Sequence, residues 1–214
     1  MRTKSLNWLV CPSSGCGGAL SPSPSFKPIY IDPTGQELTE AVLSCRTCGD
    51  EYPVILGVAL LEIDLGAYLG AFWDEIEACG AELSGVEISR AMRSYLGIAS
   101  SFTGQPGPAT PSPDLQWTTS PYLQAHFYPG SLTGYLAGWW RDAVDGHRTG
   151  KIDPYTWLMA AARERTAGRS GGLAVDVGCS VGRGAAELAS LYDYSVGVDR
   201  SFRAILAARR HLLG

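Results

Sequence analysis

The chain has 214 residues, of which 45% are hydrophobic and 18% are charged, and its formal net charge at pH 7 is −4. This composition is typical of a globular protein with one large or two small domains, and the acidic balance argues against a broad nucleic-acid-binding surface. The sequence contains no run of about eighteen apolar residues, which a membrane-spanning helix requires. Because the first residues also lack the apolar core of a secretory signal, we expect a cytoplasmic protein with no membrane partner.

Four of the six cysteines fall into two close pairs near the N-terminus. Four residues separate Cys11 from Cys16, and two separate Cys45 from Cys48. In the cytoplasm such pairs are more often metal ligands than disulfides, and structural zinc prefers a tetrahedron of thiolates. The spacing therefore predicts one zinc ion held by these four side chains. The alternative is a set of four reduced, buried cysteines.

The residues around the cysteine pairs predict a small domain with short strands over residues 1–63. Residues 29–31 and 41–44 are strand candidates, and a turn-rich loop over 21–28 precedes them. After the second pair, residues 51–62 form two short apolar segments that are broken at a glycine.

The cysteine pairs and the tail Tyr52-Pro53-Val54…Gly57…Leu60-Leu61 resemble the zinc-ribbon domain of the small activator subunits that partner tRNA and protein methyltransferases. Related domains also occur ahead of bacterial methyltransferase domains. The resemblance implies a zinc ribbon at the N-terminus.

Residues 64–118 are predicted to form a helical segment that ends in a linker. Asp64 is suited to cap a helix that runs to Cys79, before the stop signal of a glycine. The capping box Ser-x-x-Glu at residues 84–87 predicts a second helix through about residue 98.

The chain then becomes rich in glycine and proline over residues 103–113, which predicts a loop or an interdomain linker. Further helices are expected over residues 122–128, 132–144 and 153–168. Tyr122 and His126 are four positions apart and so share one face of the first of these helices.

A strand, a glycine turn, a helix and a second strand are predicted in the last 45 residues. The β-branched, apolar run Leu173–Val177 has the length of a buried strand. Residues 185–191 have the apolar spacing of a helix, and residues 195–198 form a second strand that ends at Asp199. Ser201 is suited to cap the helix that follows. The turn contains three glycines, at Gly178, Gly182 and Gly184.

This order of elements is typical of the first half of a nucleotide-binding αβ unit, in which an acid after the second strand accepts hydrogen bonds from ribose hydroxyls. The glycine spacing does not fit the dinucleotide pattern Gly-x-Gly-x-x-Gly, which disfavours an NAD-linked oxidoreductase. Asp176 at the tip of the first strand would repel a pyrophosphate but not a cationic amine or sulfonium. S-adenosylmethionine is therefore favoured over NAD, and a turn with no ligand is the other alternative.

Residues 176–182, Asp-Val-Gly-Cys-Ser-Val-Gly, resemble the first motif of class I S-adenosylmethionine-dependent methyltransferases, and Val198-Asp199 resembles the ribose-binding acid of that family. The usual middle glycine is Ser180 here. In many such enzymes, helices before the first strand cover the cofactor, so the resemblance implies that Tyr122 and His126 face it. The alternative is that their helix packs on the domain surface. The cofactor-binding residues so implied are Asp176, Gly178, Cys179, Ser180, Gly182, Asp199, Arg200, Tyr122 and His126.

The sequence thus predicts an α/β chain: a zinc ribbon, a helical middle region, and over residues 119–214 the first β-α-β-α part of a Rossmann-like methyltransferase sheet. Such sheets usually have seven strands, so the domain is expected to be C-terminally incomplete or completed by another polypeptide, and no catalytic residue is named. The expected function is methyl transfer from S-adenosylmethionine to an acceptor of unknown class. The alternative is a non-catalytic zinc-ribbon interaction or activator module with a vestigial or partner-completed nucleotide site.

Overall fold

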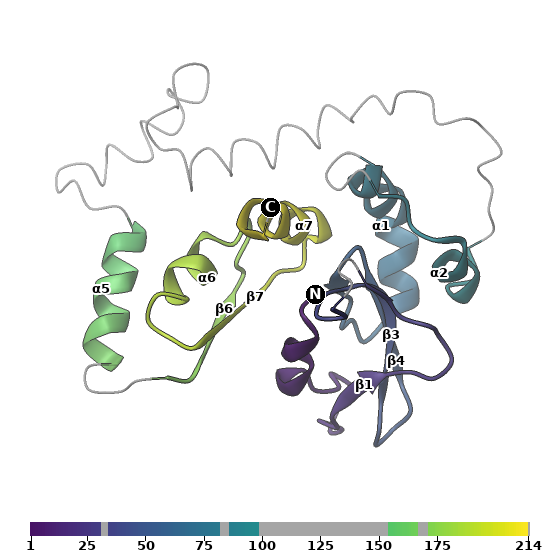
Figure 1. Cartoon of the computed structure of the whole chain (residues 1–214), viewed down its shortest axis with the longest axis horizontal. Coiled ribbons are helices and arrows are strands. Elements are labelled where there is room, and N and C mark those ends of the chain that lie inside the picture. The colour runs from purple at the N-terminus through teal and green to yellow at the C-terminus, as the bar shows by residue number, and fades with distance from the viewer. Residues whose placement is uncertain (31–33, 82–85, 99–153, 167–170, 214) are drawn as a thin grey trace, which may run out of the picture. The chain divides into compact units, whose positions relative to one another are not determined.

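The computed structural model describes residues 1–30, 34–81, 86–98, 154–166 and 171–213 (Figure 1). The chain divides into two compact units, Met1–Thr110 and Pro111–Gly214. The fold is a mixture of helices and strands, with an antiparallel sheet in the first unit and a parallel pair of strands in the second.

A curled antiparallel sheet forms the centre of the first unit. The strand order is β1-β3-β4-β5, and β2 also pairs with β3. The 3-10 helix and strands of this unit are η1 (Thr3–Trp8), β1 (Leu20–Pro22), β2 (Ile29–Tyr30), β3 (Leu38–Cys45), β4 (Glu51–Ile55) and β5 (Val58–Ala59). Seven of the eight residues of β3 are buried, as expected for a strand with neighbours on both edges. Strands were predicted at β2 and β3, whereas η1 and β1 were not.

The break predicted between the two apolar segments of residues 51–62 is a two-residue hairpin loop between β4 and β5. Ile55 pairs with Val58, and the residues between them, Leu56 and Gly57, have φ values of 51° and 79°. Two successive left-handed residues are what a type I′ hairpin loop requires. A leucine in this conformation is uncommon, but here its side chain is buried. A Cβ on Gly80 would lie 3.1 Å from Leu56 Cδ1, so the turn packs where the first long helix ends.

Helix α1 (Leu65–Cys79) has the boundaries that the sequence predicts. The Asp64 side chain accepts a hydrogen bond from Ala67 N at 2.9 Å, which caps the first turn. Ile76 and Cys79 are fully buried, so the helix packs one apolar face into the first unit.

The predicted start of the second helix is wrong. Helix α2 spans Arg90–Tyr95 and is capped by Ser89, while residues 86–88 are not helical. Ser84 itself lies outside the described residues, and Glu87 at the end of the predicted capping box precedes the helix. The physical reason is a contact distant in sequence, because Ser89 is held in an extended conformation by a glutamate of the sheet.

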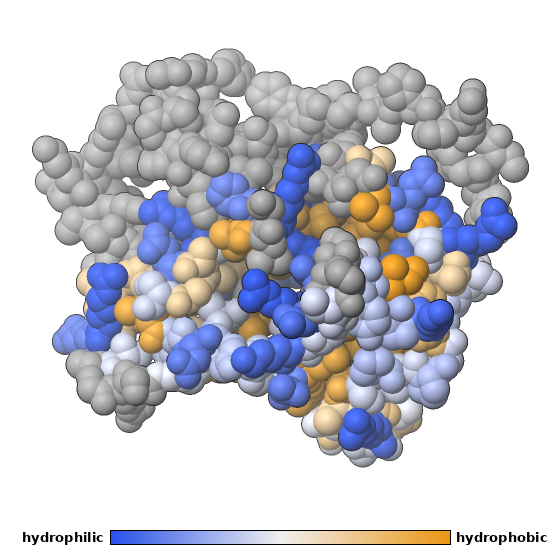
Figure 2. Space-filling model, in the orientation of Figure 1, coloured by the Kyte–Doolittle hydropathy of each residue, from blue (hydrophilic) through white to orange (hydrophobic). Residues whose placement is uncertain are grey.

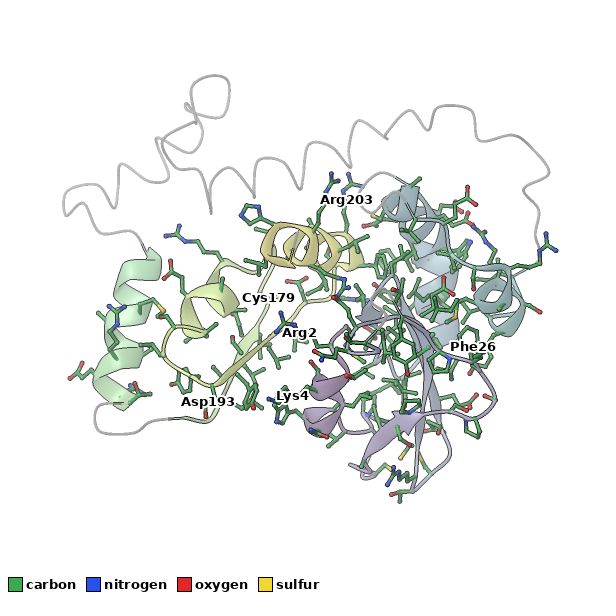
Figure 3. All side chains as sticks on the ribbon, viewed as in Figure 1. Arg2, Lys4, Phe26, Cys179, Asp193 and Arg203 are labelled. Atoms are coloured by element: carbon green, nitrogen blue, oxygen red, sulfur yellow. The ribbon has the colours of Figure 1, made fainter. Side chains whose placement is uncertain are left out.

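That glutamate is Glu40 of β3, which is only 2% exposed. One of its carboxylate oxygens accepts from Ser89 N at 2.7 Å and the other accepts from the Ser89 hydroxyl. The same hydroxyl accepts a hydrogen bond from Met92 N at 3.1 Å. The start of α2 is thus tied to the central strand. Phe26, beside α2 in Figure 3, adds an edge-on ring contact with Tyr95.

The second unit contains α5 (Pro154–Thr166), β6 (Leu173–Val177), α6 (Arg183–Leu188), β7 (Tyr194–Val198) and α7 (Phe202–Leu213). Strands β6 and β7 pair in parallel, from Leu173 opposite Tyr194 to Val177 opposite Val198. Both predicted strands and the Ser201 cap of α7 are confirmed, the latter by a 3.2 Å hydrogen bond from Ala204 N. Helix α6 begins and ends earlier than the apolar spacing predicted, because that spacing marks the packed face of a helix rather than its ends.

Several predictions fall outside the described residues. They are the linker over 103–113, the helices over 122–128 and 132–144, and with them Tyr122 and His126. Within the part of the chain that is described, no helix has the length and apolarity needed to cross a membrane. Hydrophobic side chains do reach the surface on the face shown in Figure 2, and the most exposed of the large ones are Ile63 and Val177.

The tie between Glu40 and Ser89 can be tested by mutation. Replacing Ser89 with alanine removes both a helix cap, worth about 1 kcal/mol, and a hydrogen bond to a buried carboxylate, worth about 1.5–3 kcal/mol. We expect Ser89→Ala to lower the free energy of unfolding by about 2.5–4 kcal/mol in urea titrations at constant metal content. Asp64→Ala, which removes only a cap, should cost about 1 kcal/mol. Equal losses in the two variants would contradict this account of α2.

Candidate functional site

The four cysteines of the two pairs lie together in the first unit. Their sulfur atoms are all within 4.8 Å of one another, with 3.6 Å between Cys11 and Cys48 and 3.5 Å between Cys16 and Cys45. A tetrahedral ion with metal–sulfur bonds of about 2.3 Å has sulfur–sulfur edges of about 3.8 Å. The four sulfurs therefore have the spacing of a tetrahedral metal site. The structure describes no disulfide among them.

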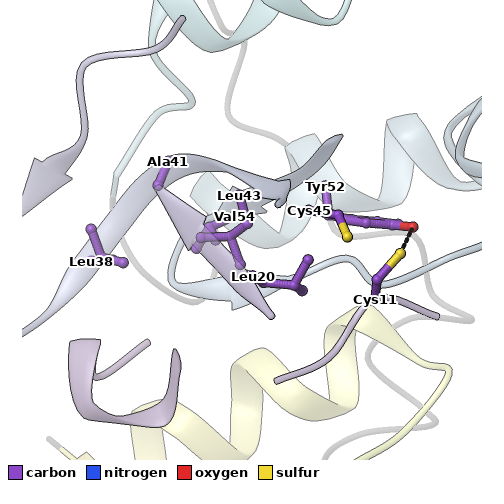
Figure 4. Packing of buried hydrophobic residues seen from close by; sticks show 8 residues of the cluster. All are labelled: Cys11, Leu20, Leu38, Ala41, Leu43, Cys45, Tyr52 and Val54. Atoms are coloured by element: carbon purple, nitrogen blue, oxygen red, sulfur yellow. Dashed lines mark hydrogen bonds between the residues drawn. The ribbon is translucent and has the colours of Figure 1, made fainter. Parts of the chain in front are cut away.

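Two of these sulfurs belong to the hydrophobic core of the first unit. Cys11 and Cys45 are each 3% exposed and pack with apolar residues of the sheet (Figure 4). Cys16 is partly exposed and Cys48 is exposed. The group is therefore anchored on its inner side by the sheet and open to solvent on its outer side. The core residues drawn are Cys11, Leu20, Leu38, Ala41, Leu43, Cys45, Tyr52 and Val54.

Short turns aim the cysteines at a common point. The backbone of each pair closes on itself, with Cys16 N donating to Ser13 O and Gly49 N donating to Cys45 O. A third hydrogen bond, from Cys11 N to Gly18 O at 2.8 Å, ties the first pair to the residues that lead into β1. Because the second pair follows β3 directly, the sheet fixes the distance between the two turns.

Gly18 is required by close approach. A Cβ at this position would lie 2.7 Å from Cys45 Sγ and would also collide with the side chain of Thr47. The first cysteine turn can therefore reach the second only because this residue has no side chain. The sequence predicts a tight turn at Gly17, after the second cysteine of the first pair, but the role of Gly18 was missed because its contact is with a residue 27 positions away.

Hydrogen bonds lower the pKa of two of the thiols. Backbone N–H groups of Cys48 and Thr47 donate to the Cys45 sulfur and lower its pKa to about 6, although burial acts in the opposite direction. Burial raises the pKa of Cys11, but hydrogen bonds from Tyr52 and its neighbours outweigh it, so the pKa lies below that of an ordinary thiol. These two sulfurs are the ones best suited to carry negative charge.

The pKa values of the other two thiols, Cys16 and Cys48, are raised instead. Backbone hydrogen bonds at Gly18 and Asp50 lower the pKa values of Cys16 and Cys48, but burial and the neighbouring sulfurs together outweigh them, so both pKa values lie above that of an ordinary thiol. Four thiolates in one place repel one another, so the group can lose all four protons only if a cation compensates them. Metal binding and proton release are coupled in such sites.

Polar side chains surround the Cys11 sulfur. The Tyr52 hydroxyl lies 3.1 Å from Cys11 Sγ and 2.9 Å from Ser13 Oγ, and Ser13 donates in turn to Asp50. Burial, followed by the contact with Cys11, raises the pKa of Tyr52 to about 12. Tyr52 entered the sequence analysis only as part of a motif, and Ser13 and Asp50 were missed; their one signal is that each is within two residues of a cysteine.

The second candidate site is the turn between β6 and α6. Asp199, at the end of β7, reaches this turn: one carboxylate oxygen accepts from Ser180 N and the other from Ser201 N, both at 2.8 Å. Ser180 has a φ of 49°, a conformation that favours glycine. A serine therefore occupies the backbone position where the resembling motif usually has its middle glycine.

Close packing and open space alternate along the same turn. A Cβ on Gly184 would collide with the carboxylate of Asp176, and a Cβ on Gly197 would lie 2.7 Å from Cys179 Sγ. At Gly178, by contrast, no atom of the described residues lies within 4 Å of an added Cβ. The helix and the two strands are thus in close contact, while the tip of β6 faces free space.

Cys179 lies where β6 ends (Figure 3) and is buried. Burial, followed by the charges of Asp176 and Asp199, raises the pKa of its thiol to about 12. A neutral thiol is a poor nucleophile, and the buried side chain packs against Gly197 of β7.

No known protein family, curated protein or solved structure matches this chain. What the chain does is therefore inferred from the chemistry of its two candidate sites. Of the predicted site residues, the structure brings together the four cysteines in one group and Asp176, Cys179, Ser180 and Asp199 around one turn.

The close approach at Gly18 gives a direct test of the cysteine group. Gly18→Ala places a methyl group against Cys45 Sγ, so we expect zinc affinity to fall about tenfold or more, as is typical when the surroundings of metal ligands are disturbed. The measurement is a competition titration with a chromogenic chelator. Gly70→Ala, on the exposed side of α1 with nothing within 4 Å, is the matched control and should bind zinc like the wild type. Unchanged affinity in Gly18→Ala would argue against a shared metal.

Proposed function

We propose that this chain is the cofactor-binding part of an S-adenosylmethionine-dependent methyltransferase, with an N-terminal domain stabilised by zinc. The observation that carries the proposal is the position of Asp199 at the β6–α6 turn, 2.8 Å from Ser180 N. An acid that follows the second parallel strand and reaches the turn after the first is the arrangement used to hold a ribose.

The residues at this turn fit the proposed cofactor. The free space in front of Gly178 leaves room for a ligand at the strand tip. Asp199 offers lone pairs beyond the two that accept backbone N–H groups, so it is the residue that would accept from ribose hydroxyls. Asp176 would face the cationic amine. When bound, S-adenosylmethionine supplies a methyl group on a sulfonium, and the task of the protein is to align it with an acceptor.

The four-cysteine group supports structural zinc rather than a catalytic metal. All four tetrahedral positions are filled by sulfur, whereas a catalytic zinc keeps one position for water or substrate. The surrounding antiparallel sheet and the Tyr52-Pro53 segment agree with the resemblance to a zinc ribbon. In this proposal the ion stabilises the first unit and takes no part in methyl transfer.

A second candidate function is a non-catalytic zinc-ribbon interaction module. It is favoured by a difference between the two sites: the cysteine group is complete within the described residues, whereas the described part of the second unit has only two parallel strands. Parallel sheets are normally covered on both faces, yet Val175 and Val177 are 53% and 82% exposed. In both candidates, another polypeptide that covers this face is part of the proposal.

The cofactor is tested by calorimetry with S-adenosylmethionine, its demethylated product and NAD. We expect Asp199→Ala to weaken binding of S-adenosylmethionine about tenfold to a hundredfold, because a hydrogen bond to a charged group is worth about 1.5–3 kcal/mol. Asp193→Ala is the control: this exposed aspartate also accepts a backbone N–H, from Gly172, but lies outside the proposed site. Tight NAD binding, or equal effects of the two mutations, would exclude this assignment.

Metal removal tests the zinc proposal independently. Structural zinc contributes about 10–16 kcal/mol of apparent binding energy in small domains, so the first unit should lose its fold in excess chelator. Purified protein should contain one equivalent of zinc, and Cys45→Ser should contain much less. Elemental analysis and circular dichroism are the measurements. A chain that keeps its fold with less than half an equivalent of zinc would contradict the proposed zinc centre. A chain that binds zinc but not S-adenosylmethionine would favour the interaction module.

A further inference from the structure

The tyrosine beside the cysteine group has features that packing alone does not require. Tyr52 is 3% exposed, and its ring lies in the core of the first unit with the hydroxyl directed at the Cys11 sulfur (Figure 4). Phenylalanine would fill the same space with the ring alone. The hydroxyl is placed between Cys11 Sγ at 3.1 Å and Ser13 Oγ at 2.9 Å, so its direction is fixed from both sides.

The direction of this hydrogen bond follows from the chemistry of the ligands. A metal-bound cysteine is a thiolate, which has no proton and can only accept. The phenol carries a single proton, so in the metal-bound state it donates that proton to Cys11 Sγ. Ser13 gives its one hydroxyl proton to Asp50, so it can only accept from the phenol, whose proton is therefore shared between Cys11 Sγ and Ser13 Oγ. A donor to a thiolate withdraws charge from the sulfur and restrains its position.

The four sulfurs are therefore unequal. Cys11 is buried and faces a hydroxyl donor, whereas Cys48 is exposed. An electrophile approaching the group reaches Cys48 without obstruction, while the sulfur of Cys11 is both covered and reduced in charge. The difference is built into the pairing of β3 with β4, because this pairing sets Tyr52 opposite Leu43, two residues from Cys45.

We infer that Tyr52 is a positioning residue of the metal centre: its hydroxyl donates to the buried Cys11 sulfur and makes Cys11 less reactive than the exposed Cys48. The inference rests on the proposed zinc centre. It assigns to the hydroxyl a role in metal affinity and ligand reactivity, and not only in the stability of the sheet.

The test compares Tyr52→Phe with Tyr95→Phe in the full chain. Tyr95 is a suitable control because its hydroxyl also makes a hydrogen bond, to Glu51 at 2.6 Å, without contacting a sulfur. Loss of an outer partner of a metal ligand typically lowers affinity 10- to 100-fold, so Tyr52→Phe should bind Zn²⁺ that much more weakly. In Co²⁺-loaded protein its sulfur-to-metal charge-transfer band should move to lower energy, whereas Tyr95→Phe should match the wild type.

Alkylation of zinc-loaded protein by iodoacetamide, followed by mass spectrometry, gives a second measurement. The wild type should be labelled at Cys48 before Cys11, and Tyr52→Phe should bring Cys11 labelling forward. Ser13→Ala, which removes the second acceptor of the phenol proton and leaves Tyr52 in place, should not bring Cys11 labelling forward. Affinity, spectrum and labelling order that are unchanged in Tyr52→Phe would overturn the role of Tyr52 alone. A wild-type chain that takes up neither Zn²⁺ nor Co²⁺ would overturn the metal centre and this role together.

Discussion

Strand β3 is buried along nearly its whole length, and the features of the first unit depend on it. It pairs with β1, β2 and β4, it ends in Cys45, and it carries the buried carboxylate of Glu40 that fixes the start of α2. A slip of β3 by one residue would exchange the side chains that are buried on its two faces, so the register is strongly specified. The register of β3 therefore sets the position of two of the four sulfurs, of the tyrosine opposite Leu43, and of a helix 49 positions away in sequence.

The sequence predicted the parts that local chemistry decides. Asp64 caps α1 because a side chain and an N–H three residues later need nothing else, and the spacing within each cysteine pair is short enough for one turn to place both thiols together. The prediction failed where a residue distant in the sequence determines the local structure. Nothing near Ser84 shows that Glu40 will hold Ser89 instead, and nothing near Gly18 shows that the sulfur of Cys45 will fill the space beside it. The contact between Tyr52 and Cys11 spans 41 positions and appears only once β3 and β4 are paired.

In the second unit the prediction was closer, because the whole β6–α6–β7 motif lies within 26 residues. Its strands were placed correctly from short apolar runs, and the acid was placed by its distance from the first glycine. What spacing could not provide is the double use of Asp199, which joins the turn to the start of α7 through two backbone N–H groups. The side chain proposed to hold a ribose is also one that shapes the loop around it, so binding and loop order are coupled at this residue.

The hairpin loop at Leu56 shows how two opposing energies are settled in this fold. A left-handed backbone costs a residue with a side chain about 1–2 kcal/mol, and full burial of a leucine returns about 1.5–3 kcal/mol. The balance is small and favours leucine only while the end of α1 covers it. Before that helix docks, the same residue opposes its own turn. The hairpin and the helix should therefore become stable in a single cooperative step, because burial of Leu56 by the end of α1 offsets the backbone strain of the turn.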